Sequence, residues 1–185
     1  MAVRDVALIG DPILRQVARD LEPDDIRTPV VRSLVEDMID TMHELGGIGI
    51  AAPQVSESIQ LAIIEIPETS SRYPNMAPLA LTVFVNPRIT VMDHTEQALW
   101  EGCLSVPDLR GLVHRPREVL VDYQDLQGLR QSVMARDFLA SAVQHELDHL
   151  QGVLFIDRVR DTTKIATLDN YRRFWLDSPA DEIDG

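Results

Sequence analysis

The chain has 185 residues, which fits one domain, and its hydrophobic share of 45% is enough for a sizeable core. No apolar run approaches the roughly 20 residues that span a bilayer, and a formal net charge of -13 argues against general binding to nucleic acid or to an anionic membrane. The one cysteine, Cys103, excludes an intrachain disulfide and favours a reducing compartment; since the N-terminus also lacks a signal-like segment, we expect a cytoplasmic protein, or an organellar one whose leader has been removed.

The first predicted element is a helix over residues 28–47. Thr28 is a suitable N-cap, and Pro29 suits the first helical position. Gly46 and Gly47 predict the end of the helix. The apolar residues recur at steps of three and four, as on one buried helix face: Val31, Leu34, Val35, Met38, Met42 and Leu45.

The middle of the chain predicts strands. Short apolar or alternating runs rich in β-branched residues occupy residues 59–66, 80–87 and 118–125. The stretch between the first two, residues 67–78, is rich in proline, serine and asparagine and predicts a loop. Gly128 suggests a turn that joins the third strand to a further antiparallel strand.

The last third predicts helices. One should run from about residue 137 to 150, with Asp137 as a cap, an apolar face that includes Phe138, and Gly152 after its end. A final helix is expected within residues 161–177, followed by a frayed tail over about 177–185. The predicted fold is therefore α+β: one domain over residues 1–185, with antiparallel or mixed sheets around a central helix.

That central helix carries "QHELDHLQG" (144–152), in which His145 and His149 are four residues apart. Residues at this spacing lie on the same helix face, so both rings can bind one metal ion. Glu146 lies about 100° around the helix from His145, where its carboxylate can reach a metal-bound water without being a ligand. The pattern favours metal-assisted hydrolysis, although such a short motif also arises by chance on solvated helices.

A catalytic metal site needs a third protein ligand. His43 lies off the apolar stripe of its helix, His94 lies in a polar run expected to be a loop, and His114 lies between two arginines, a poor place for a cation. Cys103, in "WEGCLSVP" (100–107), is different. A lone cysteine is more often a small buried residue, or it can be a nucleophile, but with the two helical histidines a Cys-His-His set is the simplest interpretation.

Three stretches taken together, "GIGIAAPQ" (47–54), "EGCLS" (101–105) and "QHELDHLQG", resemble the signature motifs of peptide deformylases in the same order. The resemblance extends to "GDPILR" (10–15), "VFVNP" (83–87) and "GVLFIDR" (152–158), and so covers most of the chain. It implies an enzyme that removes the formyl group from N-terminal formylmethionine of new peptides.

The resemblance also assigns roles by position. It implies that the metal ligands are Cys103, His145 and His149, and that Glu146 is the general base and acid while a metal-bound water attacks the formyl carbon. It implies that Gln54 and the backbone N–H of Leu104 stabilise the oxyanion. Substrate-binding residues are expected in the motifs and one turn before His145: Ile48, Gly49, Gly102 and Ala142.

The implied cofactor is one divalent metal ion. The resemblance favours Fe(II), with nickel, cobalt or zinc as alternatives, and the softness of a Cys-His-His set also suits zinc. The implied partners are formylmethionyl peptides and nascent chains at the ribosome, although the sequence turns acidic after Arg172 and Arg173, where some family members have a basic ribosome-docking helix. The family's matching positions suggest an ion pair between Glu101 and Arg115, and Asp148 is a candidate acceptor for a ligand histidine.

Two further functions compete with this one. A metallopeptidase could use the same His-Glu-His core, although no additional motif follows it in the sequence. A structural metal-binding interaction domain is the second alternative, but such a site would have four protein ligands.

Overall fold

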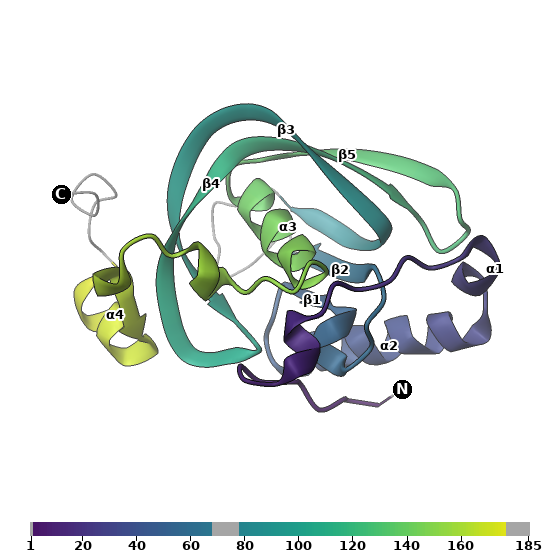
Figure 1. Cartoon of the computed structure of the whole chain (residues 1–185), viewed down its shortest axis with the longest axis horizontal. Helices are drawn as coiled ribbons and strands as arrows, with labels where there is room; N and C mark the ends of the chain where they lie inside the picture. The colour runs from purple at the N-terminus through teal and green to yellow at the C-terminus, as the bar shows by residue number, and fades with distance from the viewer. Residues whose placement is uncertain (1, 68–77, 177–185) are drawn as a thin grey trace.

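The computed structural model describes residues 2–67 and 78–176 and shows an α+β fold, as predicted (Figure 1). Five strands lie side by side in chain order, each antiparallel to the next, and a sixth pairs with the fourth strand. The strands are β1 (Gly49–Ala51), β2 (Leu61–Ile66), β3 (Leu79–Cys103), β4 (Val106–Gln124), β5 (Arg130–Arg136) and β6 (Ile165–Thr167). Strongly bent, the sheet curves around one helix.

The β3–β4 hairpin is much longer than predicted. The sequence predicts strands only over residues 80–87 and 118–125, and it places His94 in a loop, whereas His94 lies in β3 and is exposed. The register shifts four times between Val85 and Cys103, and these irregularities interrupt the alternation of apolar and polar residues. Neither face of the outer part of the hairpin is fully buried, so polar residues are tolerated there. Its composition therefore resembles that of a loop.

The turn at Gly128 is confirmed. Gly128 has φ of +74°, which a glycine adopts without strain, and the N–H of Asp125 donates to the carbonyl of Leu129 at 3.0 Å. The turn sets the register of β4 against β5, in which Gln124 is opposite Arg130.

Helix α2 (Pro29–Glu44) confirms the first predicted helix. The Thr28 side chain accepts a hydrogen bond from the Val31 N–H at 3.4 Å, and Gly46 ends the helix with φ of +64°. Its apolar face packs on β1 and β2 in one buried cluster, which includes Leu34, Met38, Ile50, Leu61 and Ile63.

Helix α3 (Asp137–His149) lies at the centre of the fold, enclosed by the sheet (Figure 1). Val143 and Leu147 pack on strands β2, β3 and β4 in a second buried cluster, and Gly152 follows the helix with φ of +72°. The prediction that Asp137 caps α3 is wrong. Arg136 occupies the N-cap without a side-chain cap bond, and the Asp137 carboxylate instead accepts from Arg117, with 2.5 Å between Oδ1 and Nη2.

The predicted final helix is confirmed only in its second half, as α4 (Leu168–Phe174). Residues 165–167 form β6 instead, which pairs with Leu109–Gly111 of β4. The remaining helical segments are short: α1 (Pro23–Ile26) and 3-10 helices at Pro12–Arg15, Ala52–Val55, Phe155–Arg158 and Thr162–Lys164. The predicted loop at 67–78, except for its two end residues, and the predicted frayed tail lie outside the described residues. Within the described part, no helix is long and apolar enough to cross a membrane.

Candidate active site

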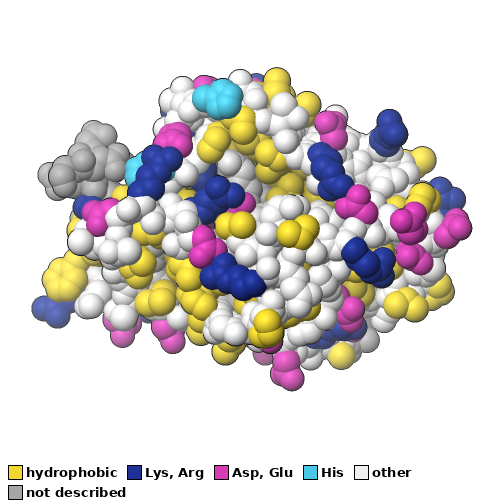
Figure 2. Space-filling view, in the orientation of Figure 1, with side chains coloured by type: hydrophobic (Ala, Val, Ile, Leu, Met, Phe, Trp, Pro, Cys, Tyr) yellow, Lys and Arg dark blue, Asp and Glu magenta, His cyan; other side chains and the backbone are white. Residues whose placement is uncertain are grey.

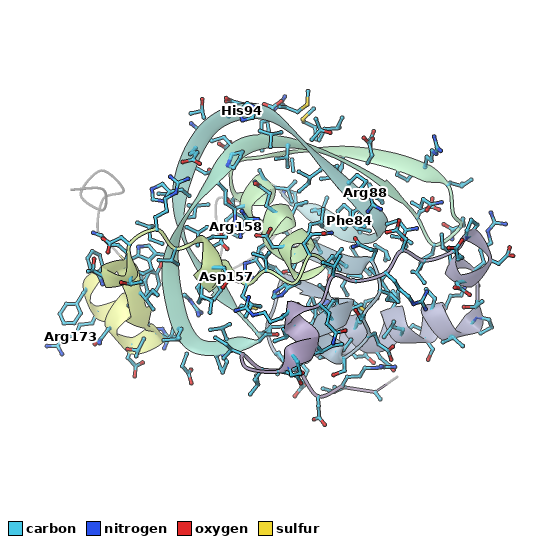
Figure 3. All side chains as sticks on the ribbon, in the orientation of Figure 1. Phe84, Arg88, His94, Asp157, Arg158 and Arg173 are labelled. Atoms are coloured by element: carbon cyan, nitrogen blue, oxygen red, sulfur yellow. The ribbon has the colours of Figure 1, made fainter. Side chains whose placement is uncertain are left out.

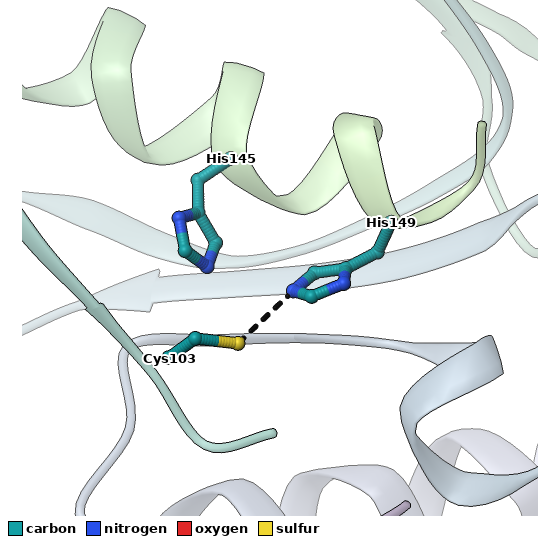
Figure 4. A group of neighbouring side chains, drawn as sticks. All are labelled: Cys103, His145 and His149. Carbon is teal, nitrogen blue, oxygen red and sulfur yellow. Dashed lines mark hydrogen bonds between the residues drawn. The ribbon is translucent and has the colours of Figure 1, made fainter. Parts of the chain in front are cut away.

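The three sequence motifs meet around α3. Gln54 lies in the 3-10 helix Ala52–Val55 directly after β1, and Cys103 is the last residue of β3. His145 and His149 project from α3 toward Cys103 (Figure 4). Segments about 50 and 90 residues apart in sequence therefore converge because the sheet wraps around the helix.

Cys103, His145 and His149 form a cluster that could hold a metal ion. One ligand atom from each residue lies within 4.8 Å of the others, and Cys103 Sγ is 3.2 Å from His149 Nε2 (Figure 4). The two imidazole rings meet edge to face, with centroids 5.2 Å apart. A thiolate and two imidazoles suit a divalent transition metal, and three protein ligands leave a coordination position open for water or substrate. The residues present thus fit a catalytic metal.

The orientation of His145 is fixed by Glu101. The distance from His145 Nδ1 to Glu101 Oε2 is 2.8 Å, so Nδ1–H donates to the carboxylate and Nε2 is left for a metal. Burial alone would raise the pKa of Glu101, but hydrogen bonds from His145 and Arg115 outweigh it and lower this pKa to about 2. The prediction that Asp148 accepts from a ligand histidine is wrong, because its carboxylate instead accepts from Arg115 and Arg158.

The predicted ion pair between Glu101 and Arg115 is confirmed. Arg115 Nε and Nη2 donate to the two oxygens of Glu101 at 2.6 and 3.0 Å. Arg115 Nη1 donates to Asp148 at 2.8 Å, and the side chain is only 3% exposed. Bidentate, buried pairs of this kind are rigid, so the carboxylate that holds His145 is itself held in place.

Glu146 combines burial with an unpaired oxygen. It is 7% exposed, and its Oε2 has no hydrogen-bond partner among the described residues. Burial raises the pKa of this carboxyl to about 7. A carboxyl whose pKa is near neutrality can accept a proton and return it at the same pH, which is what general acid–base catalysis requires.

Gly49 leaves room for Glu146, which leads to a test. A Cβ added at Gly49 would lie 2.5 Å from Glu146 Oε1, so the carboxylate would have to move. Since a misplacement of about 1 Å can cost roughly 100-fold in rate, we expect Gly49→Ala to lower kcat by about that factor with metal content unchanged. Gly47→Ala is a milder comparison, for which we expect a smaller loss of rate, because its Cβ would meet the Leu104 side chain at 3.2 Å and the Gly49 carbonyl at 3.4 Å but not Glu146. Equal rates for the two variants would contradict the assigned place of Glu146.

Gln54 is buried, at 1% exposure, and its amide orientation is fixed by its partners. Oε1 accepts from the Ala51 N–H at 2.8 Å, which turns Nε2 toward Ser105 Oγ at 3.1 Å and Cys103 Sγ at 3.5 Å. The amide N–H groups therefore point toward the candidate metal centre. Ser105 was not singled out from the sequence.

The other predicted site residues surround this centre with different contacts. The carbonyl of Ile48 accepts from the Glu65 N–H at 2.8 Å, so one polar group of that segment is used by β2. The Arg110 guanidinium covers Gly102, where a Cβ would lie 2.2 Å from Nη1. Ala142 is half-buried on α3, one helical turn before His145. The Phe155 ring, from the segment that follows α3, stacks near the His145 ring with centroids 6.1 Å apart.

The other three histidines considered as ligands lie outside the cluster, as the sequence suggests. His43 has a side chain that is 53% exposed and lies 2.6 Å from Glu65 Oε2. His94 is exposed, and His114 lies in β4; neither belongs to the metal-capable cluster of the described residues.

Residues 3–164 match the sequence model of the family described as polypeptide deformylase. The chain belongs to the polypeptide deformylase family. Members of this family are metal-dependent enzymes, and the Cys-His-His cluster agrees with that property. The match leaves out only the two N-terminal residues and the segment that contains β6 and α4.

Several named family members are similar over nearly their whole length. A peptide deformylase of Leptospira biflexa is 37% identical over 162 residues, 88% of this chain and 90% of that one. A peptide deformylase of Bordetella pertussis is 42% identical over 162 residues, with the same coverage. A solved class I type b peptide deformylase of Acinetobacter baumannii with bound Met-Ala-Ser has a TM-score of 0.81 and 39% identity, covering 85% of this chain and 99% of that one. The peptide deformylase of Thermotoga maritima has a TM-score of 0.76 and 30% identity, with 87% and 100% coverage.

Proposed function

We propose that this chain removes the formyl group from formylmethionine at the N-terminus of newly made peptides. The observation that carries the proposal is Glu146: a buried carboxylate, next in sequence to one residue of a Cys-His-His cluster, with one oxygen that has no hydrogen-bond partner within the described ranges. In this proposal the whole chain, residues 1–185, is one catalytic domain. Relatives named peptide deformylase match 88% of this chain over 90% of their own length, which supports a single domain.

Cys103, His145 and His149 would hold one divalent ion. When bound, such an ion lowers the pKa of water that it coordinates and draws electron density from the formyl carbonyl. Fe(II) is the ion that the family resemblance favours, with zinc, nickel or cobalt as alternatives that the same donor set accepts. Glu101 and Arg115 support this role, since they fix the His145 ring with Nε2 directed away from its Nδ1 partner.

Glu146 would move the proton. Its carboxylate removes a proton from the water that adds to the formyl carbon, and it then delivers that proton to the amide nitrogen as the C–N bond breaks. The products are formate and a peptide with a free amino terminus. Burial of Glu146 supports both steps, because burial raises the pKa of this carboxyl and so favours the protonated form that it reaches after taking the proton.

Gln54 and Leu104 would stabilise the oxygen that gains charge when water adds. The Gln54 Nε2 already lies next to Cys103, and the Ala51 N–H fixes the orientation of the amide, so the donor is held close to the candidate metal centre before the reaction. The Leu104 N–H follows Cys103 directly in the chain. A single preorganised donor of this kind typically contributes about 100- to 1000-fold in rate.

The substrate would bind as an extended strand beside these residues. The backbones of Ile48, Gly49 and Gly102 would pair with the peptide, and Ile48 and Ala142 would form walls of the methionine pocket. The Met-Ala-Ser peptide bound to the Acinetobacter baumannii relative supports a peptide-binding cleft in this fold. A mismatch of one methylene costs only about 1–3 kcal/mol, so peptides with other apolar first residues should react more slowly and not be excluded.

In the cell the substrates would be nascent chains at the ribosome in the cytoplasm, and the enzyme would act there without binding nucleic acid or membrane itself. The net charge of -13 supports the expectation that the enzyme itself binds neither nucleic acid nor an anionic membrane. How the enzyme reaches the ribosome would differ from relatives that use a basic C-terminal helix, because the sequence after Arg173 is acidic.

The two alternative functions predict different results. A metallopeptidase would cut unblocked Met-Ala-Ser at an internal bond, whereas we expect that peptide to stay intact. A closed structural metal site has no position for a further ligand, whereas we expect a peptide hydroxamate to bind the metal-loaded protein and inhibit it. Cleavage of the unblocked peptide would overturn the proposed function, and so would metal-loaded protein that neither binds the hydroxamate nor is inhibited by it.

A further inference from the structure

Arg158 lies at the outer end of a chain of ion pairs that leads to His145. It is the last residue of the 3-10 helix that follows α3, and its side chain is 47% exposed (Figure 3). Its guanidinium holds Asp148 with two bonds, Nε to Oδ2 at 2.9 Å and Nη2 to Oδ1 at 2.5 Å. Asp148 itself is only 11% exposed at its side chain. Arg158 thus covers a carboxylate that is otherwise nearly buried.

Asp148 connects Arg158 to the candidate metal centre. Its Oδ2 accepts from Arg158 and also from Arg115 Nη1 at 2.8 Å. Arg115 donates in turn to both oxygens of Glu101, which holds His145 Nδ1 at 2.8 Å. The path from the surface to the histidine therefore consists of side-chain contacts no longer than 3.0 Å.

Arg158 also balances the charge of this chain. Glu101 and Asp148 contribute two negative charges, and Arg115 contributes one positive charge, so Arg158 supplies the second. Without it, Arg115 alone would have to neutralise two nearly buried carboxylates. An unbalanced buried charge is costly, and the guanidinium would shift toward Asp148 at the expense of its bonds to Glu101.

A cavity beside these residues limits how far the loss of Arg158 would destabilise the charge on Asp148. Arg115, Asp148 and Arg158 line a cavity of about 680 Å³, together with apolar residues of β3 and α3 such as Ile89 and Leu147. Figure 2 shows this face hollowed beneath the outer part of the β3–β4 hairpin, with hydrophobic side chains inside and basic side chains at its edge. Water entering from the cavity would solvate Asp148 partly if Arg158 were removed.

We propose that Arg158 is a positioning residue for the metal centre: through Asp148, Arg115 and Glu101 it sets the orientation and hydrogen bonding of the ligand His145. Its influence on rate rests on the proposed deformylase function, but its influence on metal binding does not. Because direct outer-shell partners of ligands contribute about 10- to 100-fold to metal affinity, a residue further along the chain should contribute roughly three- to tenfold.

The test compares Arg158→Gln with Arg160→Gln. Arg160 is two residues further on and forms a similarly exposed bidentate pair with Glu96, at 2.7 and 2.8 Å, outside the chain of contacts to His145. Cobalt affinity is measured by chelator competition, and the absorption spectrum of the cobalt-loaded protein reports the ligand geometry. We expect Arg158→Gln to bind cobalt about three- to tenfold more weakly with an altered spectrum, and Arg160→Gln to match the parent.

Two further variants separate positioning from stability. Arg158→Lys keeps the charge but not the paired bonds and should recover part of the affinity. Arg158→Gln combined with Asp148→Asn restores the charge balance, so its affinity loss should be smaller than the sum of the two single losses. If Arg158→Gln lowers only the Tm, with cobalt affinity and spectrum equal to those of Arg160→Gln, the proposed role is wrong. A protein that binds cobalt as expected but releases no formate would contradict the proposed function instead.

Discussion

Replacing Glu146 with glutamine is expected to lower kcat/KM on a formylated peptide by roughly 100- to 10,000-fold, the usual contribution of a general acid–base group. Glutamine has nearly the same shape, so the surrounding packing is kept, but its amide neither accepts a proton from water nor returns one. Because Glu146 is not among the cluster of three candidate ligands, metal content should stay at the parent level. Steady-state kinetics and metal analysis of the same preparation check both parts.

Glu44→Gln provides a control for the loss of one acidic group. Glu44 is exposed at the end of α2, and its replacement should leave the rate unchanged. A Glu146→Gln enzyme that retains near-parent activity with full metal would show that another group moves the proton. A variant that loses its metal would instead assign Glu146 to the ligand set.

The second large effect concerns Cys103. We expect Cys103→Ser to weaken the binding of a thiophilic metal such as zinc by more than roughly 100-fold, since a hydroxyl is a harder and more weakly ionised ligand than a thiol. Activity should be lost in proportion to the metal, and excess metal should restore only part of it. Titration against a chromophoric chelator measures the affinity, and treatment of the parent with a strong chelator should abolish activity reversibly.

His43→Ala is the matched control for the ligand assignment. His43 pairs with Glu65 at the surface and lies outside the cluster, so its loss should not change metal affinity. Parent-like metal affinity in Cys103→Ser would mean that the thiol is not a ligand and that Cys103 is only a small packing residue, as a lone cysteine more often is.

Local signals were sufficient to predict the helices with strong boundaries. In α2, the Thr28 cap, Pro29 and the Gly46 stop are all encoded within a few residues of the helix ends, and the structure has them where the sequence predicts. Helix α3 also agrees, except for its cap: Asp137 begins the helix with φ of +49° and bonds to Arg117 of β4, a tertiary contact that local sequence does not contain.

Tertiary pairing explains the larger errors. The outer parts of β3 and β4 are strands because their backbones pair with each other, although the residues around His94 are polar. Likewise, residues 165–167 leave the predicted helical pattern because the edge of β4 offers them backbone partners. Neither effect has a period that a single sequence would reveal.

In the candidate site, too, local sequence predicts some contacts and only the tertiary structure gives the others. Helical spacing brings His145 and His149 together, and motif order adds Cys103. The prediction that Asp148 accepts from a ligand histidine is wrong, because helical spacing carries no information about Glu101 on β3, which accepts from His145. Phe155 and Arg158, which contact the site from the segment after α3, could not be placed without the three-dimensional fold.

The most direct measurement is the release of formate from formyl-Met-Ala-Ser by the metal-loaded protein, with acetyl-Met-Ala-Ser as the matched peptide. We predict one formate and one free Met-Ala-Ser per peptide consumed, with little or no reaction of the acetylated peptide. Cleavage of an internal peptide bond, or equal removal of both blocking groups, would contradict the account.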